Sequence, residues 1–186
     1  LSKFAEPIKK IHVVDRSDDR KIIFHNDKYK KNLGYIIKNS EIKNVTLKRL
    51  KKVKNIKLMK NFSLKKINHS NESVVAIFNN LSISTSLLIA ADGKNSSISN
   101  LFKAKKTVKK YNHSALVLNI FHKKNHLNTA HEIFFNSGPL AILPMKKTNK
   151  NLFSSSVVWS SRDPHFSSSL INNKKIMTEI LQEKIF

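Results

Sequence analysis

Alternating apolar and polar positions recur along most of the chain and predict a protein built largely of short strands. In the first half of the chain, strand-like segments lie at residues 8–14, 21–24, 56–59, 64–69, 73–78 and 81–84. In the second half they lie at residues 114–122, 132–135, 140–145 and 152–159. Because the members of the second group follow one another closely, with no helical segment between them, we expect them to form an antiparallel sheet.

Two segments have the apolar spacing of a helix. The first, residues 39 to about 54, begins with an Asn-Ser-Glu sequence that can cap a helix. The second is the tail after Pro164, in which Ile176, Ile180 and Leu181 lie at helical spacing. Strands and helices together indicate a mixed α/β protein.

A continuous apolar run at residues 87–91 is typical of a strand that is buried on both faces. The run ends in Asp92-Gly93, and a short helix is predicted directly afterwards, at residues 97–102. Folds of the α/β class bind ligands at the carboxyl ends of such strands, where the carboxylate of Asp92 could contact the ligand. Asp-Gly is also a common turn pair, so the spacing alone leaves a ligand-binding role and a purely structural role open.

The composition is that of a globular protein, with 186 residues, of which 40% are hydrophobic and 25% charged. No apolar run reaches the roughly 18 residues of a membrane-spanning helix, and the N-terminus lacks the apolar core of a signal peptide. The chain has no cysteine, which excludes a disulfide framework and a thiolate metal site. We therefore expect a cytoplasmic protein.

A large excess of positive charge raises the question of a nucleic-acid partner. Lysine and arginine number 35 against 12 acidic residues, for a net charge of +23. Only four of the basic residues are arginine, the residue that dedicated phosphate-binding proteins favour, and the lysines are scattered along the chain as pairs. We therefore attribute the excess to compositional drift and expect no nucleic acid, although affinity for anionic lipid surfaces would follow.

Several common catalytic and binding motifs are missing from the sequence. Its three glycines, Gly34, Gly93 and Gly138, are isolated, so neither a dinucleotide-binding fingerprint nor a P-loop can be drawn. His122 and His126 have the spacing of a zinc helix but lack its glutamate and lie in a strand and loop, so we expect no metal site. No serine lies in a nucleophile elbow.

Residues 87–99, LLIAADGKNSSIS, resemble the A-D-G-x-x-S-x-x-R motif of flavin-dependent aromatic monooxygenases. Further segments resemble one branch of that superfamily, the ubiquinone-biosynthesis hydroxylases. They are PIKKIHVVDR at 7–16, LGYIIKN at 33–39, YNHSALVLNIFH at 111–122, NTAHEIFF at 128–135, SGPLAILPM at 137–145 and VVWS at 157–160. Their order and spacing fit across nearly the whole chain.

The sequence departs from the family pattern in two respects. The closing arginine of the motif would fall at Ser99, so the basic contact expected there is missing or supplied by another residue. The family's N-terminal G-x-G-x-x-G loop and its later G-D motif lie outside the chain. We therefore expect the chain to be the central portion of such an enzyme.

The resemblance implies an α/β (α+β) fold with parts of two domains. Residues 36–105 would belong to a Rossmann-like FAD-binding domain that includes a parallel strand at 87–91. Residues 1–35 and 106–160 would share one mainly antiparallel sheet of the substrate domain, although they are distant in sequence. Residues 161–186 would form a helical segment that leads back toward the FAD domain.

The resemblance also implies an FAD-dependent monooxygenase that hydroxylates an aromatic ring of a ubiquinone precursor, with NAD(P)H as co-substrate and O2. The flavin would carry the chemistry, so no catalytic residue is expected. Cofactor-binding candidates are Asp92, Gly93 and Asn39. The strand expected to line the aromatic pocket supplies Gly138, Pro139, Leu140, Ala141, Leu143 and Pro144.

The expected partners are a polyprenyl phenol or quinone precursor, other ubiquinone-biosynthesis proteins, and the anionic surface of the inner membrane, which a peripheral protein would contact through its lysines. Two alternatives stay open. One is a flavin hydroxylase that acts on a soluble aromatic compound. The other is a basic module without catalysis that binds nucleic acid or an anionic surface in a salt-dependent way.

Overall fold

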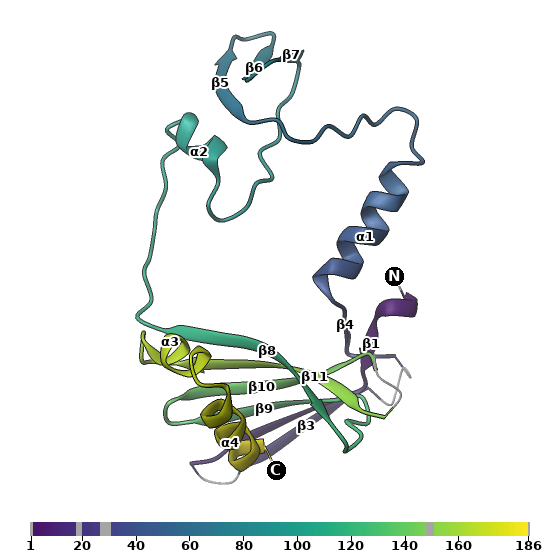
Figure 1. The fold of residues 1–186 in the computed structure, drawn as a ribbon, viewed down its shortest axis with the longest axis vertical. Helices are drawn as coiled ribbons and strands as arrows, with labels where there is room; N and C mark the ends of the chain where they lie inside the picture. Colours follow the sequence, from purple (N-terminus) through teal and green to yellow (C-terminus); the bar gives the residue numbers. More distant parts are fainter. Residues whose placement is uncertain (1, 18–19, 27–30, 148–150, 186) are drawn as a thin grey trace. The chain divides into compact units, whose positions relative to one another are not determined.

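The computed structural model describes residues 2–17, 20–26, 31–147 and 151–185. It divides into two compact units (Figure 1). The first, here called the sheet unit, comprises Leu1–Arg49 and Tyr111–Phe186, and the second, the central unit, comprises Leu50–Lys110. The sheet unit therefore joins the two ends of the sequence.

The sheet unit is built on a six-stranded sheet with the strand order β3-β2-β9-β10-β11-β8. The strands are β2 (Lys10–Asp15), β3 (Lys21–His25), β8 (Ser114–His122), β9 (Thr129–Phe135), β10 (Gly138–Met145) and β11 (Phe153–Ser161). All neighbours are antiparallel except β2 and β9, which are parallel. The expectation that the N-terminal segment and the later strands share one mainly antiparallel sheet is confirmed.

A smaller pair of strands, β1 (Glu6–Ile8) and β4 (Gly34–Ile36), lies beside this sheet, after the short 3-10 helix η1 (Ser2–Phe4). The single strand predicted at residues 8–14 is divided at Lys9. The carbonyl of Ile8 accepts the N–H of Leu33 at 2.8 Å, whereas the N–H of Lys9 donates to the carbonyl of Asn128 at 2.8 Å. The chain changes partner at this point, which ends one strand and starts the next.

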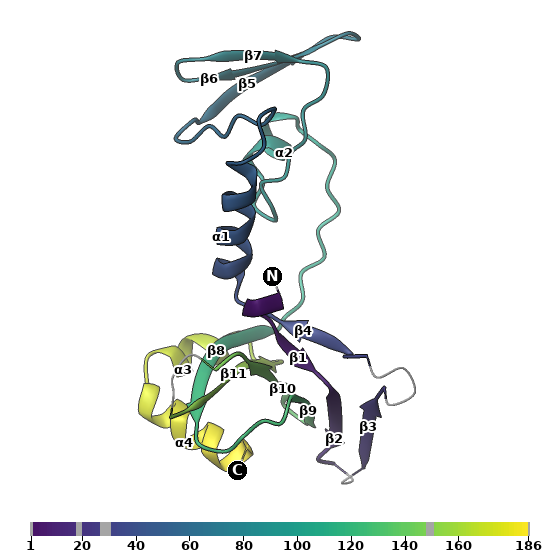
Figure 2. The ribbon, with the colours of Figure 1, turned by 90° about the vertical axis from the view of Figure 1, so that its right-hand side faces the viewer.

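Two helices, α3 (Phe166–Ile171) and α4 (Lys174–Ile185), cover one face of the six-stranded sheet, here called the helix face (Figures 1 and 2). Leu140 and Val157 have no exposed surface there, and Leu170 and Leu181 contribute from the helices. Burial of each such side chain contributes roughly 1.5–3 kcal/mol to folding. The prediction of a helical tail is confirmed, and its apolar side forms this core.

The opposite side of the same sheet, here called the open face, contacts neither α3 nor α4. Side chains alternate between the two faces along each strand, so Leu116 points to the helices and its neighbour Val117 points away. Large apolar side chains on the open face are exposed, including Val117 at 66%, Phe121 at 58% and Phe134 at 44%. An exposed apolar face of this kind is typical of a surface that binds a ligand or packs against another part of a protein.

Helix α1 (Asn39–Leu50) follows β4 and has no buried residue. The carbonyl of Lys38 accepts the N–H groups of Glu41 and Ile42, which fixes the start of the helix. The helix ends four residues before the predicted end at 54. The lysines and the arginine at residues 48–52 repel one another there, and no residue of the helix is buried in a way that would compensate within the described part of the chain.

The central unit contains a three-stranded antiparallel sheet and one short helix. The strands are β5 (Leu64–His69), β6 (Val74–Phe78) and β7 (Ser82–Thr85), and the helix is α2 (Ser97–Leu101). The predicted β5–β6 hairpin is confirmed, with Ser70 and Ser73 closing its turn through a 2.9 Å backbone hydrogen bond. His69 stacks on Phe102 with ring centroids 5.9 Å apart, which joins β5 to the end of α2.

Two strand predictions in the central unit are wrong. Neither residues 56–59 nor residues 87–91 form a strand, and Leu87 and Ile89 are 68% and 75% exposed. A strand buried on both faces needs parallel neighbours and covering helices. The described residues of the central unit supply only the antiparallel β5–β6–β7 sheet, so the run has no neighbour with which to pair. No helix in the described part of the chain is long and apolar enough to cross a membrane.

Candidate functional site

The Asp92–Gly93 turn presents an exposed carboxylate in front of α2. Asp92 Oδ2 accepts the backbone N–H of Ile98 at 3.3 Å and the hydroxyl of Ser97 at 3.4 Å. A hydrogen bond from the Ser96 side chain, together with that from the Ile98 N–H, holds the pKa of Asp92 below its usual value. The carboxylate is therefore charged at neutral pH and is already partly engaged in local hydrogen bonds.

Gly93 has a φ of +83°, a conformation that favours glycine, and no atom lies within 4 Å of the position a Cβ would occupy. Open space above a charged turn fits a polar part of FAD, such as a hydroxyl that donates to Asp92. The phosphates of FAD would need a glycine-rich approach to backbone N–H groups, which this turn does not offer. The residues of this turn could therefore make one contact with FAD, but they do not form a complete FAD-binding site.

Asn39, the third cofactor candidate, is the first residue of α1 and is exposed. It belongs to the sheet unit, whereas Asp92 and Gly93 belong to the central unit. The structure does not bring the three candidates together within one unit, and their shared role in binding the cofactor stays a prediction.

The predicted substrate strand is β10, whose residues divide between the two faces of the sheet. Leu140 lies in the core under the helices, and Pro144 is also fully buried. Pro139, Ala141 and Leu143 are half-buried and alternate with them, so they point to the open face. Of the predicted pocket residues, these three can contact a ligand on that face, whereas Leu140 supports the strand from behind.

Gly138, at the start of β10, is a structural position. Its φ is +136°, and a Cβ there would collide with the carbonyl oxygen of Ser160 in β11. The glycine permits close approach of the two backbones, and it sets the start of the strand that carries the predicted pocket residues.

One row of side chains on the open face runs through all six strands and holds a single carboxylate, Glu132. The row consists of Ile22, Val13, Glu132, Ala141, Val158 and Val117. Burial raises the pKa of Glu132. No hydrogen bond or ion pair to it occurs among the described residues, so the carboxyl group can bind a ligand placed on this face.

Glu132 is the candidate that sequence reasoning missed. The strand Thr129–Phe135 contains one acid among apolar and aromatic residues, which is the available signal. Its central position follows only from the pairing of β9 with β2 and β10. As for metals, no group of three or more histidine, aspartate or glutamate residues is placed to hold an ion within the part of the chain that the structure describes.

Comparison with known sequences gives relatives in ubiquinone biosynthesis, while no family model matches the chain. The chain is 29% identical over 173 residues to the mitochondrial ubiquinone biosynthesis monooxygenase COQ6 of Danio rerio, covering 87% of the chain and 34% of that protein. It is 26% identical over 159 residues to the ubiquinone hydroxylase UbiL of Rhodospirillum rubrum, covering 85% of the chain and 36% of that protein. The chain thus spans about a third of the length of these relatives, and the resemblance seen in the motifs is confirmed.

Comparison with solved structures supports the fold. The halogenase PltM, solved in complex with phloroglucinol and FAD, matches with a TM-score of 0.67 and 13% identity, covering 87% of the chain and 36% of the halogenase. FqzB matches with a TM-score of 0.64 and 12% identity, covering 87% of the chain and 38% of that protein. At these identities the match shows the fold alone, and it confirms the expected mixed α/β class.

Proposed function

We propose that the chain is part of an FAD-dependent monooxygenase that hydroxylates an aromatic ring of a ubiquinone precursor with NAD(P)H and O2. The observation that carries this proposal is the similarity of 85–87% of the chain to a ubiquinone biosynthesis monooxygenase and a ubiquinone hydroxylase. Because the chain spans about a third of those relatives, the activity, the substrate and the partners are proposed for the whole protein.

In this proposal the sheet unit supplies the substrate side and the central unit supplies part of the flavin side. The central unit, Leu50–Lys110, covers most of the proposed flavin-domain segment at residues 36–105, but residues 36–49, which include nearly all of α1, fall in the sheet unit. Asp92 would hold a polar group of FAD through its carboxylate, with Gly93 leaving room for the approach. Bound FAD would supply electron transfer from the nicotinamide and activation of oxygen.

The open face of the sheet suits an aromatic ring. Its apolar row allows a ring to lie against Ala141 and Val158 and to displace water from them. Glu132, between Ala141 and Val13, would accept a hydrogen bond from a phenol hydroxyl and so orient the ring. Because burial raises its pKa, this carboxyl group is also suited to hold a proton released from the phenol.

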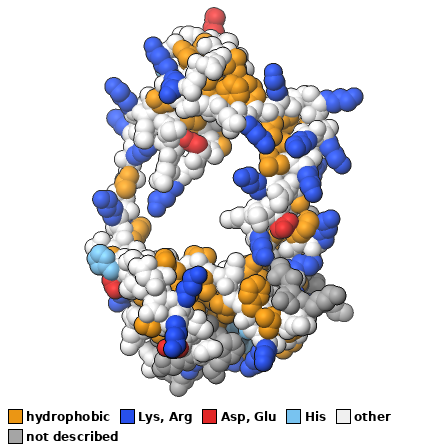
Figure 3. Space-filling view, in the orientation of Figure 1, with side chains coloured by type: hydrophobic (Ala, Val, Ile, Leu, Met, Phe, Trp, Pro, Cys, Tyr) orange, Lys and Arg blue, Asp and Glu red, His pale blue; other side chains and the backbone are white. Residues whose placement is uncertain are grey.

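We also propose that the protein contacts an anionic membrane surface. A polyprenyl substrate resides in the bilayer, and lysines attract a protein to anionic headgroups at about 1 kcal/mol each near the surface. Figure 3 shows Lys and Arg side chains scattered over the visible face without a dense patch. On the face shown, this spacing of charges is more typical of weak surface association than of a dedicated nucleic-acid interface.

The test uses protein expressed from the complete reading frame that contains this chain. With FAD, a nicotinamide cofactor and a short-chain polyprenyl phenol, we expect oxygen consumption and a product that has gained one oxygen atom by mass spectrometry. Glu132→Gln should retain flavin and lose most of the product. Failure to retain FAD, together with salt-sensitive binding to nucleic acid, would favour the basic-module alternative.

A further inference from the structure

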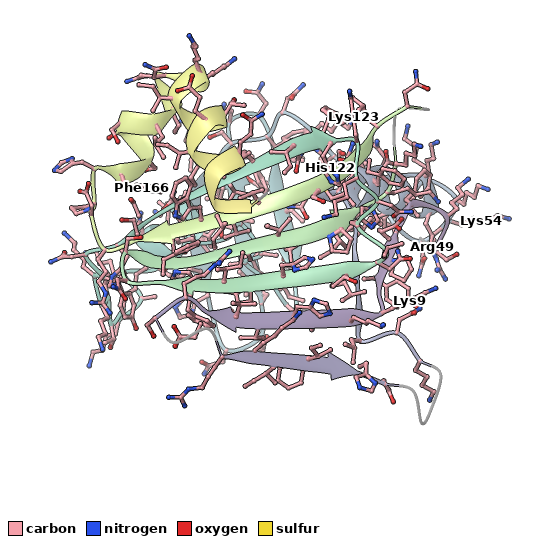
Figure 4. All side chains as sticks on the ribbon, turned by 90° about the horizontal axis from the view of Figure 1, so that it is seen from below. Lys9, Arg49, Lys54, His122, Lys123 and Phe166 are labelled. Carbon is pink, nitrogen blue, oxygen red and sulfur yellow. The ribbon has the colours of Figure 1, made fainter. Side chains whose placement is uncertain are left out.

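A cavity of about 300 Å³ lies on the helix face of the sheet, on the side opposite to the proposed substrate residues. Figure 4 shows α3 and α4 with Phe166 over one end of this face and His122 at the other end. The cavity is lined by four histidines, four apolar side chains, one lysine and three uncharged polar residues. The histidines are His12, His122, His126 and His131, the apolar residues are Ile120, Leu127, Ile133 and Ile142, and the others are Lys124, Asn125, Thr129 and Ser155. No carboxylate lines the cavity among the residues that the structure describes.

Two of the four histidines are held in place by hydrogen bonds to neighbouring residues. His126 Nδ1 accepts the N–H of Asn128 at 3.1 Å, so its Nε2 carries the proton and donates to the carbonyl of Met145 at 3.2 Å. His122 Nδ1 donates to the carbonyl of Lys124 at 2.7 Å, and its Nε2 lies 2.9 Å from the hydroxyl of Ser155. Both rings have their nitrogens engaged by the protein.

The other two histidines are not engaged in this way. His12 in β2 and His131 in β9 meet edge to face, with ring centroids 5.2 Å apart and an interplanar angle of 84°. Their ring nitrogens have no hydrogen-bond partner among the described residues, although both side chains are half-buried. Neither ring has a nitrogen that is both buried and without a partner, so water in the cavity reaches these atoms and a ligand that entered could replace it.

Among the described residues, the charges that act on the pair are positive. Burial lowers the pKa of His131, and His12, Lys21 and Lys124 lower it further. Burial also lowers the pKa of His12, with Lys21 and Lys10 acting in the same direction. Both rings are therefore neutral at neutral pH. The positive charges near them would attract an anion into the cavity.

The loop between β8 and β9 closes the cavity in a strained conformation. Leu127 and Asn128 both have positive φ values, 50° and 56°. The loop is held there by hydrogen bonds, including the Leu127 N–H to the side-chain oxygen of Asn125 at 2.9 Å and Asn128 Nδ2 to Glu6 at 2.6 Å. Strained residues that the surroundings fix in place are often associated with binding sites.

We propose that this histidine pocket binds a small organic carboxylate with an apolar body, such as an aryl carboxylate. A carboxylate only accepts hydrogen bonds and has two oxygens, so it can take one N–H from His12 and one from His131. Lys124 adds a favourable charge at the wall. The side chains of Ile120, Ile133 and Ile142 favour a ligand whose remaining part is apolar over a fully hydrated inorganic anion.

The experiment titrates the 186-residue chain with benzoate by calorimetry and compares it with two probes. Benzyl alcohol has the apolar body without the charge, and acetate has the charge without the body. We expect benzoate to bind at least about tenfold more tightly than either. Anion binding should draw a proton onto a histidine, so affinity should rise between about pH 8 and pH 6, with heats that depend on the buffer.

Variants separate the pocket from the rest of the protein. His131→Gln and, at the less buried position, His12→Gln should each weaken benzoate binding about tenfold, whereas His113→Gln, an exposed histidine outside the pocket, should not. Trp159 fluorescence reports whether each variant is folded. Absence of benzoate binding, equal binding of benzyl alcohol, or full affinity in folded His12→Gln would each overturn the proposal.

Discussion

The carbonyl oxygen of Ser160 occupies the place where a side chain at position 138 would begin. Gly138 therefore fixes how closely β10 and β11 approach, and it does so in a backbone conformation that L-residues rarely adopt. The start of the strand that carries Pro139, Ala141 and Leu143 depends on this pair.

Gly138→Ala should lower the free energy of unfolding by roughly 3 kcal/mol, because a collision with backbone adds to the cost of the positive φ. Urea unfolding followed by the fluorescence of the single tryptophan, Trp159, measures this. Gly34→Ala is the matched control in the same unit, since its Cβ would make an ordinary contact of 3.8 Å with Ile8. Equal effects of the two substitutions would contradict the role given to Ser160.

The division of β10 between two faces is tested by two truncations of the same kind. Leu140→Ala should cost about 2–5 kcal/mol of unfolding free energy, because it leaves a cavity under α3 and α4. Leu143→Ala should cost distinctly less, since this side chain is only half-buried on the open face. The assignment of faces is wrong if Leu143→Ala is the more destabilising substitution.

Glu132 should make stability depend on pH in a direction opposite to that of an ordinary paired carboxylate. Burial raises its pKa, so the folded protein binds this proton more tightly than the unfolded chain does. The free energy of unfolding of the wild type should therefore fall, relative to Glu132→Gln, as the pH rises from about 4 to 7. The effect should be small because water still reaches the side chain. Parallel pH profiles for the two proteins would show that the carboxyl group is not perturbed.

Asp92→Asn in protein from the complete reading frame should weaken FAD binding or slow flavin reduction about tenfold to a hundredfold, because a charge-assisted hydrogen bond is lost. Fluorescence titration with FAD and stopped-flow reduction measure the two quantities. Thermal stability at saturating FAD should change little, since Asp92 lies on the surface. If affinity and reduction rate are both unchanged, Asp92 serves only the turn.

The 186-residue chain by itself should not retain FAD. Phosphate binding needs backbone N–H groups that a glycine-rich loop exposes, and each of the three glycines in this chain stands alone. The purified chain should be colourless after incubation with FAD and gel filtration. A stoichiometric flavin absorbance in the protein peak would refute this expectation.

Local pattern was enough to predict the elements whose stability is decided locally. The strand at 114–122 coincides with β8, and the β5–β6 hairpin has its turn where serine and asparagine gather, because alternation and turn chemistry are both visible in the sequence. The apolar run at 87–91 is just as visible, yet it is not a strand, because a buried strand depends on neighbours that the pattern does not contain.

The candidate sites also divide into those that the local sequence reveals and those that depend on pairing between distant segments. The Asp92–Gly93 turn could be located by its motif, and its local hydrogen bonds agree with a turn before a helix. Glu132 and the pair His12–His131 could not be located, because their surroundings come from the parallel pairing of β2 with β9. That pairing joins segments more than a hundred residues apart and has no signature in either segment alone.

The β2–β9 pairing also sets an order of events during synthesis. The N-terminal hairpin cannot join its sheet until β9 has left the ribosome, which at about 5–20 residues per second means a delay of several seconds. Throughout that interval Ile22, Ile23 and Phe24 have only the β2–β3 hairpin to protect them, and even in the finished fold they are 46–57% exposed. Lys21 and Arg20 beside them add charge that discourages pairing with another nascent chain. We therefore expect the positive charge beside this hairpin to limit aggregation of the nascent chain during that interval.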